Sequence, residues 1–148
     1  MNYKKILFAT DFSPASEGAL QYATSLARDS GALLLILHVE ELPLPYAGGE
    51  MYLAQPEYPN PEIGRMLDAV VPPDKSVRFE HRLVMGTAAE DIVKVAEEEG
   101  VDLIVMGTHG RTGLARVLMG SVAEAVMRHT SCPVLTLKQA NKSAAKTR

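Results

Sequence analysis

Glycines and a serine follow one apolar run of the chain at a spacing that suits an anion-binding turn. The run Val101–Met106 leads into Gly107, Gly110, Gly120 and Ser121, which together read G-x2-G-x9-G-S. Glycine has no Cβ, so another molecule can approach the backbone closely at these positions. Gly120 and Ser121 also open a segment with helical character, and a helix N-terminus presents unpaired N–H groups and the positive end of its dipole. The pattern therefore predicts phosphate binding at the start of that helix.

The elements that would position this pattern alternate along the chain. Strands are predicted at residues 5–10, 32–39, 77–83, 101–106 and 133–137, and helices at 14–30, 62–70, 87–99 and 121–129. Ser13 and Pro14 are typical of a helix start, and Gly31 is typical of a helix end. The order βαβαβαβαβ predicts an α/β fold in one domain: an open five-stranded parallel sheet, Rossmann-like, in the order 3-2-1-4-5, with helices on both faces.

Three segments carry more specific expectations. Thr87 and Glu90 fit a capping box at the start of the third helix. The acidic run Glu97–Glu99 is expected to be a solvated helix end, although acidic side chains there oppose the helix dipole. The segment from Glu40 to Asn60 is expected to be a loop, since five of the nine prolines lie between Pro43 and Pro61.

The predicted topology brings distant residues to one crevice. In open α/β sheets, ligands bind outside the carboxyl ends of the strands, where the strand order reverses. Thr10 and Asp11 end the first strand, Val39 ends the second, and Met106 and Gly107 end the fourth. A polar carboxylate, an apolar wall and amide-rich turns suit a ribose, a flat base and phosphates respectively.

These residues resemble the universal stress protein family, in its ATP-binding subclass, over residues 3–138. The resemblance is carried by Ile6–Ser13, by His38 and Val39, by the complete glycine pattern, and by the segment Cys132–Leu135. It implies that Thr10 and Val39 contact adenine and that Asp11 lies near the ribose or a metal ion. It also implies that the ribose and phosphates are lined by Met106, Gly107 and Gly110, and that the phosphate chain is held by Gly120, Ser121 and Val122.

The resemblance further implies ligands, partners and a role. The ligand would be ATP, ADP or AMP, with Mg²⁺ or Mn²⁺ as the accompanying ion and Asp11 as its protein ligand. The chain would form a homodimer through its C-terminal strand Val134–Lys138. The protein would serve as a nucleotide-dependent module in a stress response or in regulation.

Simpler structural roles compete at several of these positions. Asp11 can cap the helix that follows it, and Ser121 can be only an N-cap. His38 fits a hydrogen-bonded core histidine better than a metal ligand, and His109 fits a solvent-facing turn.

Three function classes are consistent with the sequence. The chain has no G-x4-G-K-[ST] motif and no G-x-G-x-x-G after its first strand, which disfavours P-loop and dinucleotide-dehydrogenase chemistry. A nucleotide-binding module is therefore preferred to an enzyme. A slow ATPase or adenylyl-transfer enzyme on the same fold is the first alternative, and an interaction protein with an empty crevice is the second.

Composition bounds the remaining expectations. The net charge of −3 and the pI of about 5.8 give no support to nucleic-acid binding. The single cysteine, Cys132, excludes an intrachain disulfide and favours a cytoplasmic protein, and no apolar run is long enough for a membrane segment. The domain is expected over residues 1–138, followed by a basic tail over 139–148.

Overall fold

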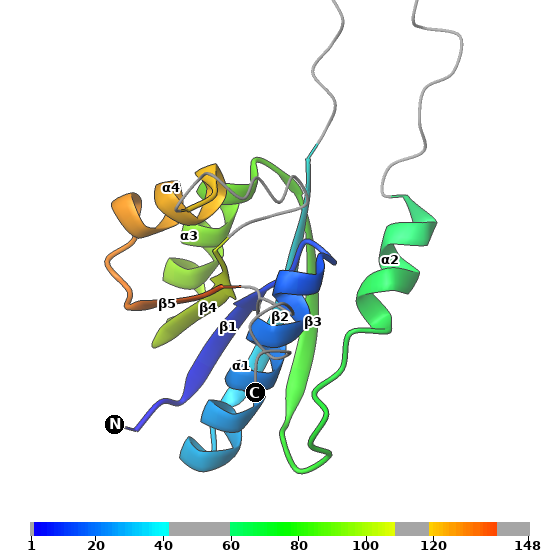
Figure 1. Cartoon of the computed structure of the whole chain (residues 1–148), viewed down its shortest axis with the longest axis vertical. Helices are drawn as coiled ribbons and strands as arrows, with labels where there is room; N and C mark the ends of the chain where they lie inside the picture. Colours follow the sequence, from blue (N-terminus) through cyan, green and yellow to red (C-terminus); the bar gives the residue numbers. More distant parts are fainter. Residues whose placement is uncertain (1, 42–59, 109–118, 139–148) are drawn as a thin grey trace, which may run out of the picture.

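The computed structural model describes residues 2–41, 60–108 and 119–138. The strands are β1 (Lys5–Ala9), β2 (Leu33–Glu41), β3 (Phe79–Gly86), β4 (Leu103–Gly107) and β5 (Val134–Leu137). The helices are α1 (Pro14–Ser30), α2 (Pro61–Asp68), α3 (Ala88–Glu98) and α4 (Ser121–His129). All strand pairs are parallel, and the sheet order β3-β2-β1-β4-β5 confirms the predicted 3-2-1-4-5 topology (Figure 1).

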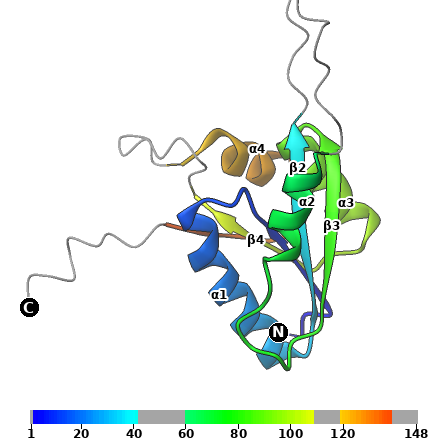
Figure 2. The same ribbon diagram turned by 90° about the vertical axis from the view of Figure 1, so that its right-hand side faces the viewer.

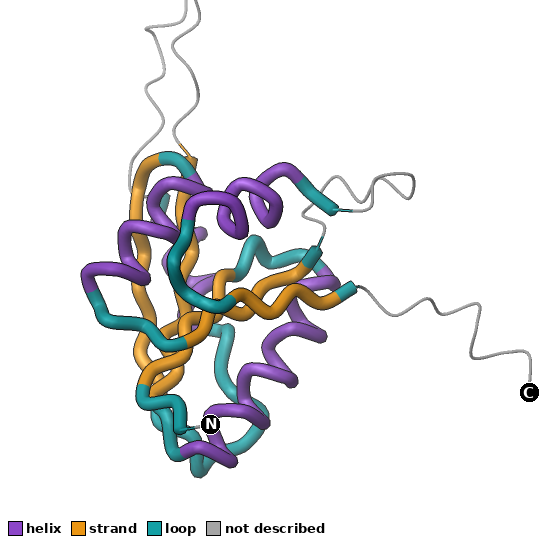
Figure 3. Tube along the Cα trace, turned by 90° about the vertical axis from the view of Figure 1, so that its left-hand side faces the viewer, coloured by secondary structure: helices purple, strands orange, loops and turns teal. Residues whose placement is uncertain are grey.

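The helices cover the two faces of the sheet (Figures 1, 2 and 3). On one face, Leu7 and Leu35 join the buried residues of α3 and α4 in one core. On the other face, Phe8 and Ile36 pack with the buried alanines of α1 and with Leu67 of α2. Because successive side chains of a strand point to opposite faces, the central strands must be apolar at nearly every position, as the sequence is.

The first helix begins and ends where the sequence predicts. Ser13 is the N-cap of α1, and Pro14 stands at the first helical position, where its missing N–H is no loss. Gly31 ends the helix with a φ of 73°, and its N–H donates back to the last carbonyls of α1. This left-handed conformation is accessible to glycine without a Cβ clash.

The predicted capping box at the start of α3 is wrong in its acceptor. Thr87 is the N-cap, but its side chain makes no capping hydrogen bond. Its backbone N–H donates to Asp91 Oδ2 at 2.7 Å rather than to Glu90, whose side chain is exposed. The carboxylate of Asp91, one position further along the helix, therefore accepts the hydrogen bond at the N-terminal end of α3.

The expectation of a solvated acidic helix end is wrong for Glu99. Its carboxylate lies 3.1 Å from Lys5 Nζ and 2.9 Å from Arg82 Nη2. Hydrogen bonds from Lys5 and Arg82 hold the pKa of Glu99 below its usual value. The two cations come from β1 and β3, and they offset the unfavourable position of Glu99 at the negative end of α3.

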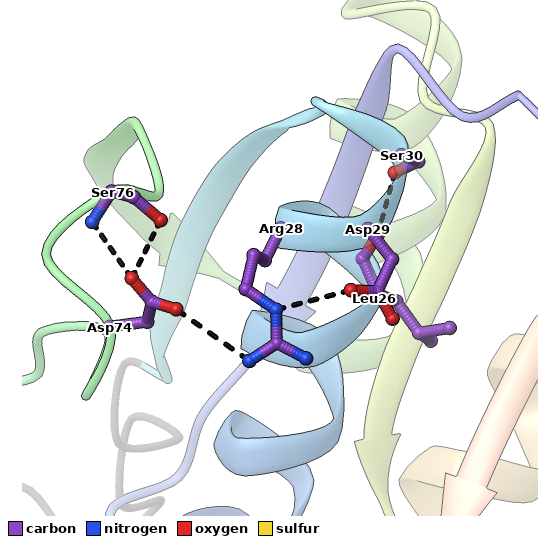
Figure 4. A network of polar contacts seen from close by, with 6 residues as sticks. All are labelled: Leu26, Arg28, Asp29, Ser30, Asp74 and Ser76. Atoms are coloured by element: carbon purple, nitrogen blue, oxygen red, sulfur yellow. Dashed lines mark hydrogen bonds and ion pairs between the residues drawn. The ribbon is translucent and has the colours of Figure 1, made fainter.

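Polar contacts fasten the connection between α2 and β3 to the end of α1 (Figure 4). Arg28 Nη1 lies 3.6 Å from Asp74 Oδ2, and Asp74 Oδ1 accepts hydrogen bonds from the backbone N–H and the hydroxyl of Ser76. Further along, His81 Nε2 lies 2.6 Å from the Val70 carbonyl oxygen. The connection therefore contacts β3 near its start and α1 near its middle.

The second strand is longer than predicted. Glu40 and Glu41 belong to β2, where they pair with Met85 and Gly86 of β3. The loop predicted from Glu40 therefore begins after Glu41, because backbone pairing with β3 continues where the apolar side chains stop. The rest of that segment, 42–59, and the predicted tail, 139–148, lie outside the described residues. None of the described helices is both long and apolar enough to cross a membrane.

Candidate functional site

A cavity of about 500 Å³ lies at the carboxyl ends of β1, β2 and β4. This volume is in the range of small-molecule sites. Its lining also includes the first residues of α3 and α4, and Ile63 of α2. The cavity therefore receives side chains from both helical layers and from the sheet edge between them.

The cavity gathers almost all of the residues that the sequence singled out. Its lining includes Thr10, Asp11, Val39, Met106, Gly107, Gly120, Ser121 and Val122. Gly110 and His109 lie outside the described residues. Segments that are far apart in the sequence thus meet at one edge, as the topology requires.

Hydrogen bonds hold the end of β1 rigidly against β2. The Thr10 N–H donates to the Leu37 carbonyl oxygen at 2.9 Å, and His38 Nδ1 lies 2.7 Å from the Thr10 carbonyl oxygen. Phe12 adopts a φ of 65°, which is uncommon for a residue with a bulky side chain. Its ring lies 4.3 Å from the imidazole of His38, centroid to centroid. His38 is thus the hydrogen-bonded core histidine that the sequence favours.

Asp11 has a structural role in the turn before α1. Its Oδ1 accepts hydrogen bonds from the Ser13 N–H at 3.0 Å and from Ser16 Oγ at 2.7 Å. Burial opposes ionisation of this carboxyl, but the hydrogen bonds from Ser13 and Ser16 outweigh it and hold the pKa of Asp11 below its usual value. Asp11 therefore helps to order the start of α1 and also presents negative charge to the cavity.

The start of α4 presents backbone donors to the cavity. Gly120 is the N-cap and Ser121 is the first helical residue, so the alternative role of Ser121 as an N-cap is wrong. The Gly120 N–H donates to the Thr108 carbonyl oxygen at 2.6 Å, and the Glu124 N–H donates to the Gly120 carbonyl oxygen. Within the described residues, the N–H groups of Ser121, Val122 and Ala123 are left without an acceptor, and all three residues line the cavity.

Gly107 has a packing role in addition to lining the cavity. A Cβ at this position would lie 3.2 Å from Ala15 Cβ and 3.4 Å from the Ala15 carbonyl carbon. The glycine therefore lets β4 and the first turn of α1 approach each other closely. Access for a ligand is not the only reason for a glycine here.

Sequence reasoning missed two buried polar residues of the cavity, Glu40 and Thr108. Their exposed fractions are 9% and 5%, and Glu40 Oε2 and Thr108 Oγ1 lack a hydrogen-bond partner in the part of the chain that the structure describes. Such atoms are rare in folded proteins and suggest a missing partner. The available signal was a charged residue directly after an apolar strand for Glu40, and a hydroxyl inside the glycine pattern for Thr108.

A doubly wound parallel sheet with a cavity at its switch point defines a class of α/β domains that bind small ligands. The chain belongs to the universal stress protein family, whose sequence pattern matches residues 2–138. It is 34% identical to universal stress protein MJ0577 of Methanocaldococcus jannaschii over 159 aligned residues, which cover 94% of this chain and 97% of that protein.

Solved structures agree with this assignment. The structure of hypothetical protein MJ0577 has a TM-score of 0.71 and 32% identity, covering 96% of this chain and 100% of that one. A universal stress protein in complex with cAMP has a TM-score of 0.68 and 26% identity, with coverage of 95% and 100%. The universal stress protein of Archaeoglobus fulgidus in complex with dAMP has a TM-score of 0.67 and 26% identity, with coverage of 93% and 100%.

The contact at Gly107 predicts opposite effects for two glycine substitutions. Gly107→Ala should lower the free energy of unfolding by about 1–3 kcal/mol, because β4 or α1 must shift to admit the methyl group. Gly18→Ala, in an open position of α1, should raise it by roughly 0.5–1 kcal/mol. Urea unfolding measures both values. A Gly107→Ala variant as stable as the wild type would contradict the close approach.

The lowered pKa of Asp11 predicts a pH dependence of stability. The ionised carboxylate stabilises the fold above its unfolded pKa of about 4, and this contribution is lost as the pH falls through the lower folded pKa. Asp11→Asn should therefore lower the free energy of unfolding by about 1 kcal/mol near neutral pH. The loss should become progressively smaller below about pH 4. Urea unfolding across this pH range, with Glu80→Gln at an exposed carboxylate of β3 as control, measures the difference. A difference that does not change with pH would refute the assignment.

Proposed function

We propose that this protein binds an adenine nucleotide (ATP, ADP or AMP) in the cavity and acts as a nucleotide-dependent regulatory module of the stress response. The observation that carries the proposal is the start of α4, where the N–H groups of three cavity-lining residues have no acceptor among the described residues, in a cavity of nucleotide size. Relatives in this family have been solved in complex with cAMP and with dAMP, which both contain adenine.

The arrangement of the cavity suggests how the nucleotide lies. The phosphates would sit at the N-terminus of α4, where backbone donors and the helix dipole favour negative charge. The base would lie between the apolar side chains of Val39 and Met106, both of which line the cavity and are over nine-tenths buried. Thr10 would also contact the base, and the ribose would then occupy the space next to Asp11, after the end of β1.

A divalent cation is compatible with this site only in partnership with the nucleotide. No group of three His, Cys, Asp or Glu side chains that could hold a metal ion occurs among the described residues. Mg²⁺ is commonly held by one or two carboxylates together with substrate phosphates. We propose Asp11 as the carboxylate, since its pKa keeps it ionised near neutral pH.

We also propose a homodimer formed through the outer edge of β5. This strand pairs with β4 on one side only, and all four of its residues are partly exposed. The Pro133 and Leu137 carbonyl oxygens accept hydrogen bonds from β4 and from Thr108. Because backbone groups alternate along a strand, those of Val134 and Thr136 point away from β4 and are available to another chain.

The proposed phosphate position predicts a ligand-dependent effect of Ser121→Ala. If the hydroxyl donates a hydrogen bond to a phosphate, the affinity of the variant for ATP should fall at least about tenfold. This factor corresponds to the free energy of one hydrogen bond to a charged group. Adenosine should be affected little. Isothermal titration with both ligands measures this, and Ser25→Ala in α1 is the matched control. Equal weakening of ATP and adenosine would mean that Ser121 only shapes the start of α4, and no binding of ATP to the wild type would refute the proposed function.

The proposed dimer predicts that one proline separates the chains. Thr136→Pro removes an outward-facing N–H and leaves the hydrogen bonds to β4 intact, so a folded monomer is expected. Thr136→Val keeps the N–H and should remain a dimer. Light scattering of the wild type and both variants at tens of micromolar gives the masses. A monomeric wild type, or a dimeric Thr136→Pro, would exclude this edge as the interface.

A further inference from the structure

Glu40 places a buried carboxylate in the cavity at the end of β2. It is 9% exposed, and its Oε2 has no hydrogen-bond partner in the described part of the chain. Burying an ionisable acceptor without a partner is unfavourable. Its neighbour Glu41 has a structural partner, since Glu41 Oε1 accepts the Ala88 N–H at 3.0 Å. The two adjacent carboxylates therefore have different roles, and only that of Glu40 is unexplained.

The described residues offer no cation to Glu40. Their ion pairs involve other carboxylates, and no metal-binding group forms among them. His38, two positions earlier on the same face of β2, already uses Nδ1 in its contact with the Thr10 carbonyl oxygen. A molecule in the cavity can therefore supply the donor that Glu40 lacks.

Glu40 lies at the β2 end of the cavity, next to Val39 in the chain, and its side chain leaves β2 on the opposite face from that of Val39. β1 lies between β2 and β4 in the sheet, and α4, which follows β4, carries the donors for phosphate. Two strand spacings separate the ends of β2 and β4 by about 10 Å. A phosphate at α4 is therefore kept away from the Glu40 carboxylate, as like charges require.

We propose that Glu40 is a specificity-determining residue that accepts a hydrogen bond from the exocyclic amino group of the bound adenine. This inference rests on the proposed function, because it concerns the nucleotide in the same cavity. An ionised carboxylate is only an acceptor. Adenine presents a 6-amino donor, whereas hypoxanthine presents a 6-oxo acceptor at the same position. The site should therefore favour adenine over hypoxanthine.

Titration with ATP, inosine triphosphate and purine riboside triphosphate tests this contact, because purine lacks the 6-amino group but keeps the adjacent ring nitrogen unprotonated, as in adenine. We expect the wild type to bind ATP at least about tenfold more tightly than either of the other two. Glu40→Gln keeps the size of the side chain, and its amide can turn to face adenine or hypoxanthine, so the ratio of the affinities for ATP and inosine triphosphate should fall to near one. Glu40→Leu should weaken ATP and also lose the preference. Glu98→Gln, at an exposed position of α3, should keep the wild-type ratio.

The outcomes separate this inference from the proposed function. If the wild type binds none of the three nucleotides, the proposed function fails. If it binds ATP and Glu40→Gln keeps the wild-type ratio, nucleotide binding stands and the role of Glu40 is refuted. Tighter binding of guanosine triphosphate than of ATP would also refute the inference, since guanine carries a 6-oxo group and would have to use its other donors. Urea unfolding of each variant checks that it is folded.

Discussion

Parallel pairing of β1 with both β2 and β4 is the constraint on which the rest of the structure depends. It brings the carboxyl ends of β1, β2 and β4 together at one edge of the sheet, and it buries β1 on both faces. The chain leaves β1 through α1 on one face and reaches β4 through α3 on the other. Among the described residues, the space at this edge is therefore lined by strand ends, turns and helix ends.

The sequence predicts the architecture well because a strand that is buried on both faces is apolar at every position. Runs such as Ile6–Ala9 and Leu34–Leu37 have no polar face, and only strands within a covered parallel sheet need that. Helix ends are also predictable where backbone conformation demands one residue type, as at Pro14 and Gly31. The topology follows, because strands separated by helices can pair in parallel only through crossovers of consistent hand.

Details that depend on which of several side chains reaches a donor are not predictable in this way. Glu90 and Asp91 are both acidic and adjacent, and only the folded helix shows that Asp91 accepts the Thr87 N–H. Glu40 illustrates a second limit: its charge suggested a loop, whereas the ladder with β3 keeps it in the strand. Thr108 is a third case, since an unpaired hydroxyl can be recognised only once the surrounding chain is in place.

Helix α2 buries little of its surface against the rest of the domain, which affects how often one side of the cavity opens. Leu67 is the one residue of this helix that is buried among those described, yet Ile63 lines the cavity. The sheet hydrogen bonds do not pass through α2, so it can detach while the strands stay paired. Elements with few buried contacts open at a fraction of the global unfolding free energy. Amide hydrogens of α2 should therefore exchange with solvent long before those of β1. The rate of that local opening would set how often the Ile63 side of the cavity opens to solvent.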